Sequence, residues 1–366
     1  MSKTSRTLAT MAGTLALVPT VLLADGPKFS GFVTGSYIYD LNDPMTGVIN
    51  NKLGGTNFYG GENASFKADA AHLTITGGDS AGASYTIDLD AGTDGVATGG
   101  ALVSTTGFAF DVQQAFVSVP FGKSPLGLQV GKFYTSEGIE VGNSAANPTV
   151  TRGLAFGVLE FTSSTGAVLT FKANDQISGA IGAINNTNGQ VWQNVGNDDG
   201  IPVGYAKVAL AYGDPFSATI SAYYGPQGGH DSIGVQDRKM YTSLDLTGLN
   251  KTLIPSVDLN FQGNFEWKDK WVAGAAYTAY LLGLQPLYHM GAAQIGLRYE
   301  FLSVDQGTTT TVNSIALAPG YKLTQNTLIR AEYRIDFATE KIFDDDKGVM
   351  DTKTDMVVGG ELNYTF

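Results

Sequence analysis

The chain has 366 residues, with 22 basic and 34 acidic side chains, a net charge of −12 and no cysteine. The acidic balance argues against nucleic acid as a partner, and the lack of cysteine excludes disulfide bonds and thiolate metal sites. Glycine supplies 47 residues, nearly twice its usual share of about 7%, and 19 Phe and 17 Tyr make the chain rich in aromatic residues.

The chain begins with a segment laid out like a secretory signal peptide. Lys3 and Arg6 give a positive start, and a mostly apolar run follows from Leu8 to Ala24. We predict a signal peptide over residues 1–24 and one domain over residues 25–366. An uncleaved anchor is the alternative, although the run is shorter than the roughly 18 apolar residues that a membrane helix needs. No later run is long enough for such a helix.

Alternation of apolar and polar residues then predicts long β-strands, most clearly in the second half of the chain. Residues 257–267, 271–281, 293–301 and 327–337 each have an apolar face, which in residues 271–281 includes Tyr277, Ala279 and Leu281. Strands of about ten residues suit a tilted crossing of lipid, whereas strands of soluble proteins usually have about five or six. We therefore predict an all-β fold, a transmembrane antiparallel up-and-down β-barrel whose apolar faces contact lipid. A secreted soluble β protein is the alternative.

Sixteen strands account for the whole pattern, and an even number puts both chain ends in the periplasm. The predicted strands are 28–39, 66–76, 82–90, 111–119, 126–133, 153–162, 166–173, 205–212, 216–224, 238–246, 256–266, 271–281, 292–302, 313–322, 327–337 and 354–366. Connections after odd strands are mostly long and those after even strands mostly short, as in outer-membrane barrels. Residues 178–186 are assigned to a loop because a further strand would make the count odd. Residues 267–271 and 282–291 are exceptions, being too short for an outer loop and too long for a periplasmic turn.

One stretch is similar to a known family. In residues 111–144, Gln114, Ala115, Phe116 and Val117 lie in a strand, and a second strand ends with Gly131, Lys132 and Phe133. A loop with Thr135, Gly138 and Glu140 follows. This pattern resembles the OmpL-like β-barrel porins, as does the opening strand at residues 31–44, although Ser136 stands where the loop of that family has a proline. The resemblance implies a porin-type barrel but no particular solute.

Charged residues on the polar strand faces are the candidate functional residues, because side chains lining a pore set its selectivity. The predicted pore-lining and constriction residues are Lys132, Glu137, Glu140, Arg298, Glu300, Arg330, Glu332, Arg334 and Asp336. Residues 134–151 resemble, in position only, the inward-folded loop of general porins. We expect this loop to enter the lumen and to set Glu137 and Glu140 across the constriction from the three arginines.

Two alternatives concern this lumen. Residues 174–204 could fold inward instead of residues 134–151, and the alternating charges of residues 330–336 could be mostly paired with one another.

Acidic clusters at residues 197–200 and 344–346 are interpreted as solvated loops. The more specific alternative is that they bind Ca²⁺, which bridges them to lipopolysaccharide phosphates. His72, His230 and His289 belong to no catalytic motif, so we expect no enzymatic activity, no metal site and no cofactor.

The C-terminal segment GGELNYTF predicts a closing strand that pairs with the first one. Leu362, Tyr364 and Phe366 are expected to face lipid and to act as the signal for the barrel-assembly machinery. The predicted function is an outer-membrane porin, a water-filled passive diffusion channel for small hydrophilic solutes and ions with a mild preference for cations. The expected partners are outer-membrane lipid, lipopolysaccharide and the assembly machinery, and a homo-oligomer is compatible with this function. A structural or adhesive barrel with an occluded lumen is the alternative.

Overall fold

The computed structural model describes residues 26–42, 64–93, 103–105, 108–134, 137–141, 144–160, 163–185, 202–211, 216–227, 237–247, 254–268, 276–344 and 350–366. The predicted signal peptide, His230 and the acidic stretch 197–200 lie outside these ranges. No helix within them is long and apolar enough to cross a membrane.

Sixteen long antiparallel strands dominate the described residues, which confirms the all-β prediction and its strand number. They are β1 (Lys28–Asp40), β2 (Ser65–Gly78), β3 (Ser84–Gly92), β5 (Phe108–Pro120), β6 (Leu126–Tyr134), β7 (Ser163–Lys172), β8 (Ile177–Ile184), β9 (Val203–Ala211), β10 (Ser217–Gln227), β11 (Asp237–Thr247), β12 (Val257–Lys268), β13 (Tyr277–Met290), β14 (Ala293–Asp305), β15 (Thr309–Lys322), β16 (Thr327–Ala338) and β19 (Thr354–Thr365). Short β4 (Val103–Thr105) pairs with β5, and β17 (Phe343–Asp344) pairs with β18 (Met350–Thr352).

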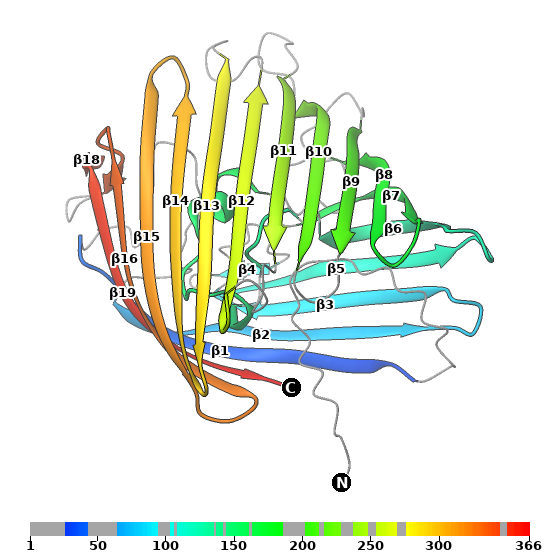
Figure 1. Ribbon diagram of the computed structural model, residues 1–366, viewed down its shortest axis with the longest axis horizontal. Helices are drawn as coiled ribbons and strands as arrows, with labels where there is room; N and C mark the ends of the chain where they lie inside the picture. Colours follow the sequence, from blue (N-terminus) through cyan, green and yellow to red (C-terminus); the bar gives the residue numbers. More distant parts are fainter. Residues whose placement is uncertain are drawn as a thin grey trace.

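Each long strand pairs with the long strand before it and the one after it along the chain (Figure 1). β1 also pairs with β19, from Phe32 opposite Thr365 to Asp40 opposite Val357. The pairings therefore form a closed circuit of strands, and the backbone groups of the first and last strands bond to each other. A membrane-spanning sheet needs this arrangement, because lipid offers no hydrogen bonds to an open edge.

The connections alternate in length, and the structure removes one predicted exception. β13 continues to Met290 and β14 begins at Ala293, so the turn predicted to be periplasmic holds two residues. The long connection predicted at residues 282–291 is therefore wrong, and His289 lies in a strand. At the opposite end, β12 ends at Lys268 and β13 begins at Tyr277, so that connection is longer than predicted.

Two element assignments are wrong, and their errors cancel in the strand count. Residues 153–162 were predicted to form a strand, but residues 155–159 form a short π-helical turn. Apolar residues run continuously there, and periodicity cannot separate strand from helix in such a run. Residues 177–184 form β8 and not a loop. Its glycines suit close packing: a Cβ on Gly179 would lie 2.5 Å from the ring of Phe171 on β7.

The two faces of the sheet follow the alternation, with one exception in β13. On β19, Leu362 and Tyr364 are about half exposed on the outer face, whereas Glu361 and Asn363 are buried inside. Along β13, Tyr280 and Leu282 point outward, and the alternate residues are buried. The prediction that Tyr277, Ala279 and Leu281 contact lipid is therefore wrong. Both faces of this half-strand are apolar, so alternation does not tell them apart.

Candidate functional site

A loop between β6 and β7 lies against the inner wall of the barrel. We call residues 137–141 and 144–160 the inward loop. Its side chains Ile139, Val150, Leu154 and Leu159 are buried, although no regular sheet contains them. Irregular backbone at membrane depth is tolerated only where protein buries it or water reaches it, because its polar groups need partners. The inward loop finds these partners on β12, β14 and β16.

Two carboxylates of the wall accept hydrogen bonds from backbone N–H groups of the inward loop. Glu332 on β16 accepts from the N–H of Val150 at 2.5 Å and from the N–H of Thr151 at 3.1 Å, and the Thr151 hydroxyl also donates to it. Glu300 on β14 accepts from the N–H of Leu154 at 2.6 Å and from that of Ala155 at 3.2 Å. Buried carboxylates thereby satisfy donors that the irregular backbone leaves unpaired.

Two wall arginines bond the carbonyl side of the same loop. Arg330 on β16 donates to the carbonyl oxygens of Asn147 at 2.5 Å and of Ser144 at 2.7 Å. Arg334 donates to the carbonyl oxygen of Arg152 at 2.5 Å. The guanidinium group suits this role because its donors spread in a rigid plane and it stays charged when buried.

Arg298 on β14 bonds both a carboxylate and backbone of the inward loop. Its Nη1 lies 2.8 Å from Oε1 of Glu140, 2.7 Å from the hydroxyl of Thr149 and 2.5 Å from the carbonyl oxygen of Thr151. Glu140 also accepts from the Nε2 of Gln285 on β13 at 3.0 Å. Gln285 is not among the residues predicted from the sequence, although it is an isolated amide within an apolar run.

Every wall arginine of this site is paired with an acid. Arg330 lies 2.6 Å from Glu361 on the neighbouring β19, and Arg334 lies 2.6 Å from Asp336 on its own strand. Arg298 contacts Glu140 directly. The expected arrangement, with Glu140 across an aqueous gap from the arginines, therefore differs from the observed one. Direct contact cancels most of the field that separated charges would produce.

The two other predicted site residues are also buried. Lys132 on β6 lies 3.3 Å from the carboxylate of Asp111 on β5 and donates to the carbonyl oxygen of Val112 at 2.7 Å. Glu137, at the start of the inward loop, is 8% exposed. Lys132 thus joins two neighbouring strands and does not contact the loop through any of these bonds.

A glycine makes room for the inward loop at the wall. A Cβ on Gly296 of β14 would lie 1.9 Å from the carbonyl oxygen of Pro148, which is closer than any real contact. On the adjacent β13, a Cβ on Gly283 would meet nothing nearer than 3.6 Å. Gly296 lies between Gln294 and Arg298 on the inner face of its strand. A glycine within strict alternation is a signal that could have marked this close approach.

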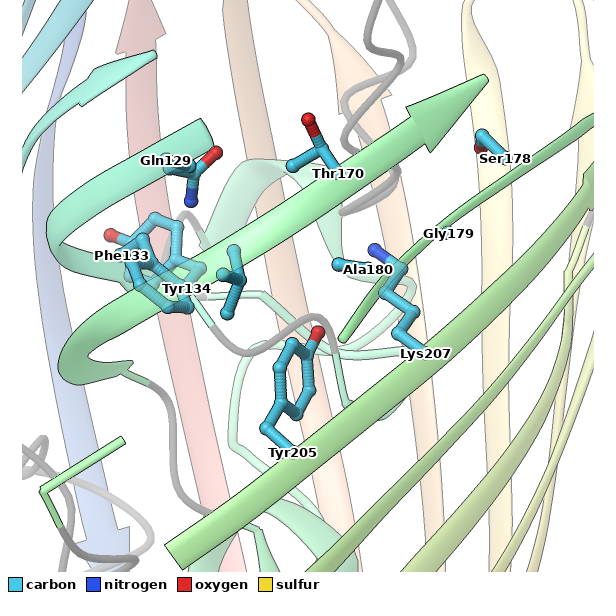
Figure 2. A pocket seen from close by; sticks show the side chains of 10 residues that line it. Gln129, Phe133, Tyr134, Thr170, Ser178, Gly179, Ala180, Tyr205 and Lys207 are labelled. Carbon is cyan, nitrogen blue, oxygen red and sulfur yellow. The ribbon is translucent and has the colours of Figure 1, made fainter. Parts of the chain in front are cut away.

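A cavity lies along β6 to β9 (Figure 2). Figure 2 shows Gln129 and Phe133 from β6, Thr170 from β7, and Tyr205 and Lys207 from β9 around it. Its lining mixes hydroxyl, amide and ammonium groups with aromatic rings. The cavity is small, with room for a water molecule.

The buried charges of the described residues are mostly acidic, at thirteen acids against eight bases. The acids are Asp40, Asp69, Asp88, Asp90, Asp111, Glu137, Glu140, Glu266, Glu300, Glu332, Asp336, Asp355 and Glu361. The bases are Lys67, Lys132, Arg152, Lys207, Lys268, Arg298, Arg330 and Arg334. No group of three or more His, Asp or Glu side chains in the described part is placed to hold a metal ion.

Solved structures with this architecture include outer-membrane proteins, among them a channel and a porin. The outer membrane channel DcaP of Acinetobacter baumannii is 12% identical, with a TM-score of 0.63 over 93% of this chain and 97% of its own. The trimer form of OmpT from Vibrio cholerae is 11% identical, with a TM-score of 0.59 over 93% and 99% of the two chains. The anion-selective porin of Comamonas acidovorans is 13% identical, with a TM-score of 0.59 over the same shares. At such low sequence identity, the structural similarity shows a shared fold alone.

Among curated protein sequences, none matches this chain. The family model "Putative beta-barrel porin-2, OmpL-like" matches residues 26–366, which is nearly the whole chain and includes every strand of its described part. This match and the barrel confirm the resemblance seen in residues 111–144. The chain therefore belongs to the OmpL-like family of β-barrel porins, which form channels in the outer membrane of Gram-negative bacteria.

Proposed function

We propose that the protein is a passive diffusion channel for small hydrophilic solutes and ions, narrowed by its inward loop. The observation that carries the proposal is the polar interior of a barrel whose outer face is apolar. Such an interior holds water in a barrel of this strand number. Passage then needs no cofactor, no metal and no enzymatic step, because the barrel only supplies an aqueous path.

A mild preference for cations is the finer part of this proposal. It is supported by the excess of buried acids over buried bases in the described residues. Acidic linings raise the local concentration of cations, whereas paired charges contribute little. Several of these acids are paired with arginine, so we expect the preference to be weak.

Liposome swelling tests the proposal. Liposomes that contain the refolded protein should swell in small neutral sugars, and the rate should fall steeply as the sugar becomes larger. Protein-free liposomes are the control. Swelling no faster than in the control, with protein that migrates on gels as a folded, heat-modifiable barrel, would overturn the proposal.

A structural or adhesive barrel with an occluded lumen is a second candidate. One observation favours it: a continuous cluster of buried apolar side chains lies inside the barrel and includes residues of the inward loop. An occluded barrel would fold normally and would pass neither sugars nor ions, so the swelling experiment separates the two functions.

We further propose partners and processing that follow from this location. The lipid-facing strands contact outer-membrane lipid and lipopolysaccharide, and the barrel-assembly machinery inserts the chain after removal of residues 1–24. Sequencing the N-terminus of the mature protein tests the cleavage. The trimer form of OmpT supports a homo-oligomer by its similar fold, and cross-linking in outer membranes tests that assembly.

A further inference from the structure

The barrel interior contains an apolar layer. One continuous cluster of buried apolar side chains extends from β6–β10 to β13–β15. It consists of Phe133, Leu154, Ala155, Leu159, Val168, Ala180, Ile184, Val203, Tyr205, Tyr223, Tyr277, Ala279, Leu281, Leu302, Val304, Val312, Ile342 and Phe343. In an open water-filled barrel such side chains would face outward, toward lipid.

On the wall, the apolar layer ends sharply on its periplasmic side. Leu281, Leu302 and Val312 lie side by side on β13, β14 and β15. Two residues further toward the periplasm, the next row holds Gly283, Glu300 and Ser314. On these three strands the inner surface therefore changes from apolar to polar and charged within one step of the pleat, and the apolar part lies toward the long connections.

The inward loop is anchored at this boundary. Glu300 accepts the N–H groups of Leu154 and Ala155, which fixes the π-helical turn at the level where the charged rows end. Leu154 and Leu159 are 1% and 2% exposed and belong to the apolar cluster. Phe133 on β6 and Tyr205 on β9 belong to the same cluster and also line the cavity of Figure 2. The loop thus adds its apolar side chains to those of the wall, and together they form one apolar layer inside the barrel.

We propose that Leu154 and Leu159, together with Phe133 and Tyr205, form a hydrophobic constriction that decides which solutes pass. The inference rests on the proposed channel function and adds its selectivity. An ion must shed part of its hydration shell to enter an apolar constriction, and that loss costs much free energy. Apolar constrictions also restrict flow by excluding water. Small uncharged organic solutes therefore pass more readily than ions of similar size.

Single-channel recording tests the constriction with polar substitutions. Leu159→Asn and Leu154→Asn introduce an amide while keeping the backbone N–H groups that Glu300 binds. We expect each to raise the ion conductance several-fold, because the amide lets water enter. Leu328→Asn is the matched control. Leu328 is buried on the inner face of β16 and lies outside the cluster, so the conductance of this variant should equal that of the wild type.

Liposome swelling gives an independent readout. Wild-type protein should admit arabinose faster than the gluconate ion, and Leu159→Asn should narrow the difference. Leu159→Thr, a smaller change, replaces Leu159→Asn if that variant does not migrate as a folded barrel.

The outcomes separate the constriction from the channel itself. Equal ion conductance of wild type and all folded variants, or equal entry of arabinose and gluconate into wild-type liposomes, would overturn the hydrophobic constriction and leave the channel standing. A folded wild type and folded variants that all conduct nothing would overturn both. Conductance in Leu159→Asn but not in the wild type would support the constriction and contradict an open channel.

Discussion

At the scale of single residues, buried charges on the barrel wall bond the backbone of the inward loop. Glu332 is 4% exposed and accepts three hydrogen bonds from Val150 and Thr151. Arg330 and Arg334 bond carbonyl oxygens of the same segment. A charged side chain that serves a backbone group is hard to replace, because its loss leaves the partner unpaired away from water.

Glu332→Gln should weaken the attachment of the inward loop. The amide oxygen of glutamine can take the place of Oε2 and accept both N–H groups, but these bonds lose the negative charge that strengthens them. Hydrogen bonds to charged groups are worth about 2 kcal/mol each, so we expect the temperature of heat modification on gels to fall by several degrees. Glu340→Gln, at an exposed position, is the control and should leave it unchanged. Equal midpoints for the two variants would contradict the role of Glu332.

Gly296→Ala should displace the inward loop by sterics alone. The new methyl group would collide with the carbonyl oxygen of Pro148, so the loop or the strand must move. Overpacking of this kind usually costs about 1–3 kcal/mol. Gly283→Ala on the neighbouring strand meets only ordinary contacts and serves as the control. The measurement is single-channel conductance with its noise. A Gly296→Ala channel indistinguishable from Gly283→Ala would show that the loop does not pack as described.

At the scale of elements, the closing pair of strands explains the aromatic end of the chain. Phe366 and Gly31 exchange two backbone hydrogen bonds, at 3.1 and 3.0 Å. A Cβ on Gly31 would lie 2.7 Å from the Phe366 ring, so the ring lies over a position without a side chain. The last residue therefore takes part in joining β1 to the C-terminal end.

Deletion of Phe366 should lower the yield of assembled barrel several-fold, because it removes both hydrogen bonds and the ring at the closing pair. Phe366→Tyr keeps the backbone bonds and an aromatic ring and should assemble like the wild type. The measurement is the fraction of outer-membrane protein that migrates as a heat-modifiable band. Normal assembly of the deleted chain would refute the assembly signal.

Sequence patterns predicted most elements because each barrel strand has one face toward lipid and the other toward polar groups of the interior. β14 and β16 illustrate this, since their arginines and glutamates alternate with large apolar residues. The pattern fails where the interior is itself apolar. In β13, Tyr277 and Leu281 belong to the same buried cluster as Leu154 and Leu159 of the inward loop, and residues 154–159 are mostly apolar because they pack inside the barrel.

The bonds of the candidate site were beyond sequence reasoning for a related reason. The position of residues 134–151 in the chain predicted that they enter the lumen near Arg298, Arg330 and Arg334. The bonds from these arginines to loop carbonyl oxygens have no signal in the sequence, because such contacts depend on the irregular path of the loop and leave no periodic pattern. Glu332 and Gly296 act through backbone atoms in the same way.

At the scale of the whole molecule, the lining charge should bias ion flow. Replacing Glu137 and Glu140 together by glutamine removes two of the buried acids. The reversal potential in a salt gradient should then move toward zero or toward anion preference. Asp175→Asn, in an exposed turn at the periplasmic end, is the control and should leave the reversal potential unchanged. No shift in the double variant would count against acids of the inward loop as the source of cation preference.

The central claim is that the barrel conducts water and small solutes past an inward loop that is fixed to the wall. Conductance of the refolded wild-type protein in planar bilayers, recorded at several salt gradients, tests it most directly. We predict discrete conductance steps, smaller than those of an unobstructed barrel of this strand number, with a weak preference for cations. A complete lack of steps from protein that migrates as a folded, heat-modifiable barrel would contradict the claim and favour the occluded barrel.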